Sequence, residues 1–122
     1  MADEISVNVT LTCTNGEFSS FAKSYSFTAD QATAGGGQPG TVPVTTTDAA
    51  IAINNLTTPR WAMIKNIGAN PVDIGPTSGG AIVKLARVLP GEAFPVPLAP
   101  SVALRAQATT GTSTLEISAL EA

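Results

Sequence analysis

The sequence predicts an all-β protein, a single-domain antiparallel β-sandwich that is jelly-roll-like. Two observations predict this fold class. Apolar and polar residues alternate along most of the 122 residues, and the spacing of three and four that is typical of helices is absent. The alternating runs are short, and turns rich in glycine, proline and asparagine separate them at roughly the 8 to 12 residue spacing of sandwiches and barrels. An up-and-down barrel fits less well, because the expected strands differ in length.

The N-terminal segment predicts a pair of strands. In residues 5–12 the odd positions are aliphatic and the even positions are small and polar, so we expect one buried face and one wet face. Asn15 and Gly16 then supply a turn. A second strand follows, in which three rings of one parity are expected to meet the first strand across the core: Phe21, Tyr25 and Phe27.

Residues 29–40 predict a flexible, exposed loop. They have no periodicity, and they contain a glycine triplet in which the backbone is freer than elsewhere in the chain: Gly35, Gly36 and Gly37. Ordering such a backbone costs roughly 1 to 2 kcal/mol per residue. We therefore expect this loop, and the residues before Ile5, to adapt to a partner rather than to belong to the core.

The rest of the chain predicts eight further short strands, at residues 42–46, 50–56, 61–67, 72–74, 81–89, 93–98, 102–108 and 113–120. Prolines fall mostly between these runs, where a missing amide donor does least harm. Pro95 and Pro97 lie inside one run and mark it as an edge strand or a bulged one. A split of the chain would leave halves of about 60 residues, which is marginal for stability. We therefore expect one domain over residues 1–122.

The small number of charged residues indicates which kinds of molecule the protein binds. Charged residues make up 12% of the chain, about half the usual share, and such a surface suits contact with other protein. The net charge is -3 and no basic run is present, so nucleic acid is not an expected partner. No signal peptide and no run of about 20 apolar residues is visible, which predicts a protein that is made in the cytoplasm and binds no membrane.

Two single residues invite alternative interpretations. The lone Cys13 closes an alternating run, and a buried thiol that packs as a small hydrophobe is favoured over a reactive or intermolecular one. Trp61, beside Arg60, is either a core residue or an exposed platform for a sugar or a protein partner. The core is favoured, because Met63, Ile64 and Ile67 follow it.

The inventory of chemical groups predicts no enzyme. The chain has no histidine, which excludes Ser-His-Asp catalysis and most zinc sites. The glycine triplet lacks the Gly-Lys-Ser/Thr sequence of a phosphate loop. Carboxylates that could form an acid–base pair have simpler roles in turns and on strands: Asp30, Asp48, Asp73, Glu92 and Glu116. We expect no catalytic residue, no metal, no cofactor and no small-molecule substrate.

One half of the chain resembles a known class of proteins. Residues 61–75, Trp-Ala-Met-Ile-Lys-Asn-Ile-Gly-Ala-Asn-Pro-Val-Asp-Ile-Gly, are followed by a Gly/Ser turn, by Leu-Pro-Gly-Glu at 89–92 and by Leu-Glu-Ile-Ser-Ala-Leu-Glu at 115–121. This pattern resembles small β-sandwich structural proteins of tailed bacteriophage virions. It covers residues 60–121, and its motifs are turns and core positions, which specify a fold more sharply than a role.

The resemblance implies a viral structural protein of the virion. It is compatible with a capsid decoration, or cement, protein that binds the major capsid protein on the outside of the shell, as a homotrimer. A tail, fibre or head–tail adaptor component is the alternative. A carbohydrate-binding module, from another class, would need exposed aromatic platforms, for which Trp61 and Tyr25 are the candidates. Arginine is enriched where proteins meet, and the candidate interface residues are Arg60, Arg87, Arg105, Gly35, Gly36 and Gly37.

Overall fold

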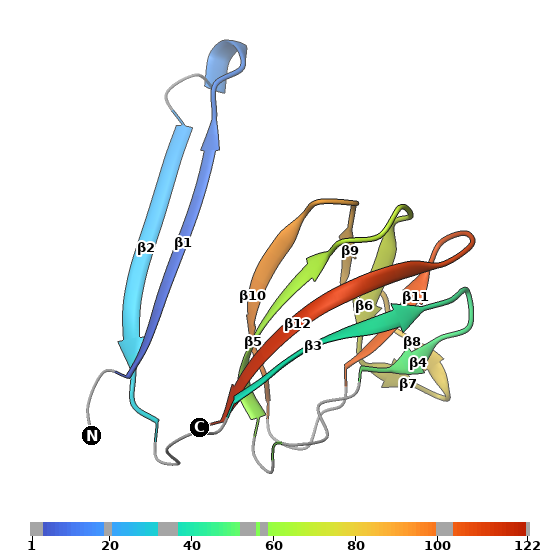
Figure 1. The fold of residues 1–122 in the computed structure, drawn as a ribbon. Coiled ribbons are helices and arrows are strands. Elements are labelled where there is room, and N and C mark those ends of the chain that lie inside the picture. Colours follow the sequence, from blue (N-terminus) through green and yellow to red (C-terminus); the bar gives the residue numbers. More distant parts are fainter. Residues whose placement is uncertain are drawn as a thin grey trace. The chain divides into compact units, whose positions relative to one another are not determined.

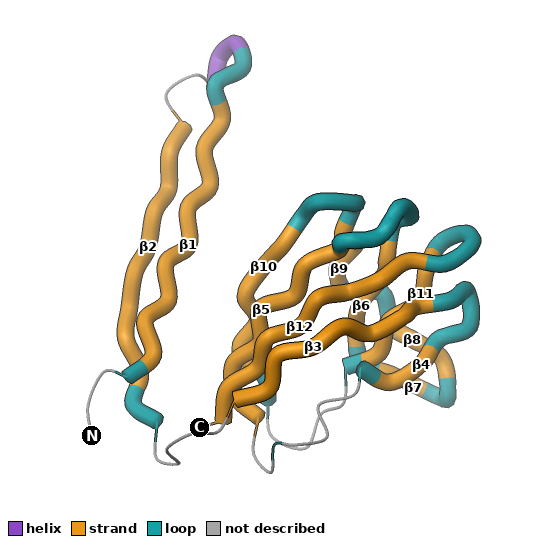
Figure 2. Tube along the Cα trace, in the orientation of Figure 1, coloured by secondary structure: helices purple, strands orange, loops and turns teal. Residues whose placement is uncertain are grey.

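The chain folds into a hairpin and a sandwich (Figure 1). The computed structural model describes residues 4–18, 21–31, 37–51, 56, 59–99 and 104–121, and the remaining residues are grey in Figure 2. Contacts within the chain group it into two compact units, Met1–Ala34 and Gly35–Ala122. Strands dominate both units, so the predicted all-β fold class is confirmed.

The first unit contains one long hairpin. Strand β1 (Ile5–Cys13) pairs antiparallel with β2 (Phe21–Ala29) in an unbroken register that runs from Ile5 opposite Ala29 to Cys13 opposite Phe21. A short 3₁₀ turn, η1 (Gly16–Phe18), follows β1. Gly16 has a φ of +54°, a conformation that glycine adopts without steric cost. The expected strand pair and its turn are therefore confirmed.

The hairpin does not bury its rings in a core. Phe21, Tyr25 and Phe27 remain 40%, 63% and 45% exposed, so the expectation that they meet the first strand across a core is wrong. The reason is geometric. In a two-stranded ribbon the paired residues lie side by side on the same face, and a second layer is needed to cover them. Cys13 is half-buried for the same reason, rather than buried as expected.

The second unit contains two four-stranded antiparallel sheets. The first sheet has the order β10 (Ala93–Pro97), β5 (Pro59–Asn66), β12 (Ser113–Glu121) and β3 (Gly37–Val44). The second has the order β4 (Ala49–Ala50), β11 (Arg105–Ala108), β6 (Val72–Gly75) and β9 (Ala86–Val88). A small additional hairpin joins β7 (Thr77–Ser78) to β8 (Ala81–Ile82).

The pairing of the two sheets is nested. In chain order, β3 pairs with β12, β4 with β11, β5 with β10, and β6 with β9. The first strand of the sandwich thus pairs with the last, and each following pair lies inside the previous one. Strands β5 and β12, and strands β6 and β11, then join these pairs into sheets. The result is a long double ribbon that is folded over to form two layers.

The core lies between these two layers. The first sheet contributes fully buried Ile64 and Leu115, and the second contributes Val72 and Ile74. Burying such a side chain stabilises the fold by roughly 1.5 to 3 kcal/mol relative to leaving it exposed. In β12 the buried positions are the alternate ones, as the sequence predicts for a strand with one covered face.

Several expected boundaries are wrong. The strand expected at 50–56 is reduced to β4, because Ile51 and Leu56 lie outside any strand and residues 52–55 fall outside the described residues. The loop expected at 29–40 ends earlier, because Gly37 to Gly40 lie in β3 and pair with β12 from Leu120 to Ile117. The single strand expected at 81–89 is two short strands, β8 and β9. Gly79 and Gly80, at φ of +62° and +82°, form the tight turn of the β7–β8 hairpin, and the chain then crosses from β8 to β9.

The expected edge strand is confirmed. Strand β10 carries Pro95 and Pro97 and lies at the end of its sheet, where the missing amide donors leave no neighbour unpaired. The described strands of the two four-stranded sheets all belong to Gly35–Ala122. The expectation of a single domain over residues 1–122 stays a prediction.

Candidate interaction surfaces

The residues expected at an interface do not form one cluster. Arg60 lies in β5 of the first sheet, whereas Arg87 and Arg105 lie in β9 and β11 of the second. Gly37 begins β3, and Gly35 and Gly36 fall outside the described residues. Each arginine instead contacts a different group of the sandwich itself.

Arg60 packs on Trp61. Its guanidinium carbon lies 4.7 Å from the ring centroid, a cation–π distance, and its Nη1 donates a hydrogen bond to the Leu98 carbonyl at 3.3 Å. Trp61 is half-buried and shares its parity with exposed Met63, whereas Ala62 and Ile64 face the core. The expectation that Trp61 fills the core is therefore wrong, because the alternation of β5 directs the smaller Ala62 inward.

Arg87 is paired with Asp73. Asp73 lies on β6 with the opposite parity to the core residues Val72 and Ile74, as the sequence predicts, yet it is only 2% exposed. Its carboxylate accepts from Arg87 Nε at 2.7 Å and from Arg87 Nη2 at 3.2 Å, and Lys84 Nζ lies 3.4 Å away. The hydrogen bonds from Arg87 lower the pKa of Asp73 although burial opposes the shift, and the same pair raises the pKa of Arg87.

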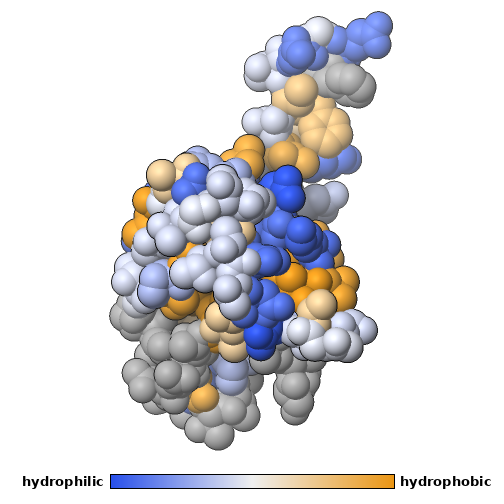
Figure 3. Space-filling model, turned by 90° about the vertical axis from the view of Figure 1, so that its right-hand side faces the viewer, coloured by the Kyte–Doolittle hydropathy of each residue, from blue (hydrophilic) through white to orange (hydrophobic). Residues whose placement is uncertain are grey.

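Arg105 is paired with Asp48. Its Nε donates to Asp48 Oδ1 at 2.6 Å and its Nη2 donates to the Asp48 carbonyl at 3.3 Å. The second carboxylate oxygen of Asp48 accepts from the Ile82 amide at 3.2 Å. Asp48 therefore joins β11 to the β7–β8 hairpin. Arg87 and Arg105 therefore each link two segments of the second unit, and one face of the molecule carries hydrophilic side chains beside hydrophobic ones (Figure 3).

The motifs that carry the resemblance meet in one place. The side chain of Asn66, fully buried at the end of β5, donates to the carbonyls of Asn70 at 2.8 Å and Val88 at 2.9 Å. Its oxygen accepts from the Gly68 amide at 3.0 Å and from Ser113 Oγ at 2.8 Å. All four hydrogen-bonding positions of this amide are satisfied, which a buried polar group requires.

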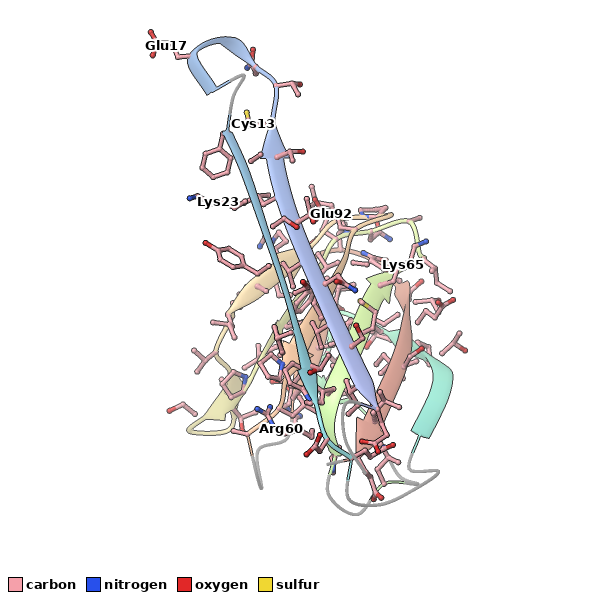
Figure 4. All side chains as sticks on the ribbon, turned by 90° about the vertical axis from the view of Figure 1, so that its left-hand side faces the viewer. Cys13, Glu17, Lys23, Arg60, Lys65 and Glu92 are labelled. Atoms are coloured by element: carbon pink, nitrogen blue, oxygen red, sulfur yellow. The ribbon has the colours of Figure 1, made fainter. Side chains whose placement is uncertain are left out.

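The Pro-Gly-Glu turn completes this cluster. The Asn66 carbonyl accepts from the Gly91 amide at 2.8 Å, and the Asn66 amide donates to the Glu92 carbonyl at 3.0 Å. Glu92 Oε1 accepts from the Leu89 amide at 2.8 Å, which holds the turn together. Figure 4 places Glu92 and Lys65 at the opposite end of β5 from Arg60. The Lys-Asn-x-Gly and Pro-Gly-Glu motifs therefore join β5, β9 and β12 at one end of the sandwich, which is a structural role.

The sequence predicted the turns in this region but not the hydrogen-bonded cluster around Asn66. A buried Asn66 looks like an exposed turn residue in the sequence, because asparagine is common in both settings. The spacing of Asn66 and Gly68 was the available signal. A Cβ on Gly68 would overlap Ser113, so only glycine fits there.

The hairpin exposes several large apolar side chains on one face. Besides the three rings, Leu11 is 64% and Val9 is 39% exposed. Figure 4 shows Cys13 and Lys23 along this hairpin and Glu17 at its tip. Contiguous exposed apolar side chains mark interaction sites, so this surface is a candidate for binding another molecule. The sandwich also exposes large apolar side chains, among them Leu85 at 74%.

Comparisons with known proteins add no relatives. A scan of the chain against protein-family models finds no match, and no curated protein has a significantly similar sequence. Among the described residues, no group of three or more histidine, cysteine or acidic side chains is placed to hold a metal ion. No helix within the described ranges has the length and apolar character needed to cross a membrane.

Proposed function

We propose that the protein is a structural protein of a bacteriophage virion, a cement protein that binds the outside of the capsid and bridges its subunits as a homotrimer. The resemblance of residues 60–121 to small phage virion proteins motivates this proposal. The observation that carries it is the nested pairing of the sandwich strands, in which β3, β4, β5 and β6 pair with β12, β11, β10 and β9.

This nested pairing supports the jelly-roll-like arrangement that the sequence predicts. A jelly roll has eight strands in two sheets, formed by folding a long antiparallel ribbon over itself. Viral capsid domains use this architecture often, and lectin domains use it as well. The fold therefore supports a role in the virion by analogy only. Which role the protein has must be inferred from the residues on its surface.

The proposed mechanism is physical. A cement protein stabilises a shell by burying surface that neighbouring capsid subunits leave exposed. A standard protein interface buries about 1,600 Å², and repetition of such contacts over many sites multiplies the stabilisation without chemistry. Arg87 and Arg105 of the sandwich are paired with aspartates of the same chain, so we do not assign the capsid contact to these side chains.

The alternatives have less support. A tail, fibre or head–tail adaptor component would use the same fold, and location in the virion separates it from a cement protein. A carbohydrate-binding module needs an open aromatic platform, but the guanidinium of Arg60 lies over the Trp61 ring. Tyr25, the second candidate platform, belongs to the hairpin unit rather than to the sandwich.

Capsid binding tests the proposal. Purified protein would be mixed with empty expanded capsids of the phage, and bound protein would be counted relative to the shell protein after sedimentation. A fixed stoichiometry on expanded capsids, with little binding to unexpanded procapsids as the control, is the expected result. Location of the protein in purified tails but not on capsids would instead support the adaptor or fibre alternative, and binding to a glycan array would support the carbohydrate-binding module.

A further inference from the structure

We propose that the apolar face of the β1–β2 hairpin is a self-association surface, and that its occupant is the same face of a second copy of this chain. The register defines this apolar face. The residues that lie side by side on it are Ile5, Val7, Val9, Leu11 and Cys13 of β1, and Ala29, Phe27, Tyr25, Lys23 and Phe21 of β2. Ile5 and Val7 are only 5% and 9% exposed, so the open part of the face runs from Val9 to Cys13 and from Phe21 to Phe27. The inference concerns the free protein and does not depend on attachment to a capsid.

The two faces of the hairpin differ completely in chemistry. The opposite face consists of small residues, mostly hydroxyl-bearing, namely Ser6, Asn8, Thr10, Thr12, Ala22, Ser24, Ser26 and Thr28. Thr10 Oγ1 and Ser24 Oγ lie 3.0 Å apart and form a cross-strand hydrogen bond on that exposed face. One face is therefore suited to water and the other to an apolar layer, which is the pattern of a strand pair that packs in a sandwich.

The hairpin needs a covering layer to be stable. A two-stranded hairpin is at best marginally stable alone in water, and a third strand or a packed apolar face is required. The register of this hairpin nevertheless runs unbroken over both nine-residue strands. A second copy supplies an open apolar face of matching chemistry wherever the protein is present.

The exposed area is close to what a pair of copies requires. With roughly 150 to 250 Å² per aromatic side chain, the three rings leave on the order of 300 Å² exposed. Leu11 and Val9 raise this to on the order of 450 Å², within the range of the largest patches on monomers. Two faces would then bury about 900 Å², near the lower bound of about 1,000 Å² for a specific interface.

The charge of the face is compatible with a second copy. Lys23 is its single charged residue, and it lies opposite Leu11. A lysine can lay its methylene groups along an apolar surface and keep its ammonium in water at the rim. A partner chosen by charge would need more than one such group, whereas an otherwise neutral apolar face is complementary to itself.

A matched pair of variants tests the inference. Leu11→Glu with Tyr25→Glu places two carboxylates on the apolar face, and the carboxylate introduced at position 11 would face Lys23, which preserves the pairing of the strands. Thr12→Glu with Ser26→Glu is the control, because it adds the same charge one position further along each strand, on the polar face. Sedimentation velocity at protein concentrations of about 1 to 100 μM would compare the oligomeric state of both variants with that of the wild type.

The expected result is an oligomer for the wild type and for the polar-face control, and a monomer for the apolar-face variant across the whole range. Fluorescence of Trp61, in the sandwich, would show that the variants keep a folded second unit. A wild-type monomer at every concentration overturns the inference, as does an apolar-face variant that associates like the wild type. A monomer that binds capsids through this face would identify the capsid as the occupant, and this result would also overturn the inference of self-association.

A measurement without substitutions provides a second test. Cys13 is the only cysteine of the chain and lies on the apolar face opposite Phe21. The rate at which Cys13 reacts with a thiol reagent should rise on dilution, as copies separate and the face opens. A rate that is independent of protein concentration would contradict self-association through this face.

Discussion

The hairpin and the sandwich use the same alternating pattern with opposite results. In β12 every second residue is buried, and Leu115 and Ile117 face a second sheet. In the hairpin the alternation is equally regular, but Leu11 and the rings of β2 stay exposed. Alternation therefore specifies a strand and its two faces, whereas burial of the apolar face depends on whether another layer of protein covers it.

The largest expected effect contrasts one leucine from each region. Leu115→Ala removes a fully buried side chain from the sandwich and should cost about 2 to 5 kcal/mol of the free energy of unfolding. Leu11→Ala in the hairpin should change the stability of the sandwich by less than about 0.5 kcal/mol. Urea titration followed by Trp61 fluorescence measures both. Equal costs would mean that the hairpin face is covered by the rest of its own chain.

Substitution of two glycines tests the packing of the cluster around Asn66. A Cβ at Gly68 would overlap Ser113 and the Thr114 amide, whereas a Cβ at Gly40 meets nothing within 4 Å. Gly68→Ala should therefore destabilise the sandwich by about 1 to 3 kcal/mol, and Gly40→Ala, the control, should be close to neutral. Thermal melts compare the two variants. A neutral Gly68→Ala would show that the cluster around Asn66 tolerates displacement.

The pH dependence of the sandwich follows from Asp73. Its pKa is lower in the folded than in the unfolded chain, chiefly because of Arg87, so its contribution is present above the ordinary aspartate pKa of about 4 and is lost as the pH falls through the folded value. Arg87→Met removes the main cause, so acid unfolding should begin at a higher pH than in the wild type.

Acid titrations followed by circular dichroism measure this midpoint. Lys65→Met is the control, because Lys65 is exposed in the other sheet and its loss should leave the acid midpoint unchanged. An unchanged midpoint in Arg87→Met would show that Arg87 does not set the pKa of Asp73.

The smallest effect is expected from removal of the hairpin. Deletion of residues 1–34 takes away one compact unit and leaves the described strands of the sandwich intact. The melting temperature of the sandwich should change by less than about 4 °C, since about 1 kcal/mol shifts a domain of this size by 4 to 8 °C. The same deletion should abolish self-association. Unfolding of the shortened chain would instead support the single domain predicted over residues 1–122.

Local sequence patterns were sufficient to predict most strands and turns. The Asn15-Gly16 turn, the edge strand at Pro95 and Pro97, and the start of β12 at Ser113 all match their expectations. These features depend on residues near each other in the chain, namely a glycine that tolerates positive φ, a proline without an amide donor, and an alternation of period two. Such signals are complete within a few residues.

The partners that the arginines have within the chain were not predicted. Arg87 and Arg105 bind Asp73 and Asp48, which are 14 and 57 positions away in the chain, and their expected place in an interface stays a prediction. Strand registers bring Arg87 beside Asp73, and Arg105 reaches the turn before β4. No local pattern encodes such a pairing, because it depends on which strands become neighbours.

The sequence by itself determined the all-β class, the strand faces and the turns, because these follow from side-chain periodicity and backbone freedom. Only the tertiary structure decided which apolar faces are covered. Trp61 is half-buried beside buried Ala62, Gly37 pairs with Leu120 instead of lying in a loop, and the hairpin rings are exposed. Each outcome depends on whether a second strand or sheet, distant in the chain, lies against that segment, and only the folded arrangement of the chain supplies that neighbour.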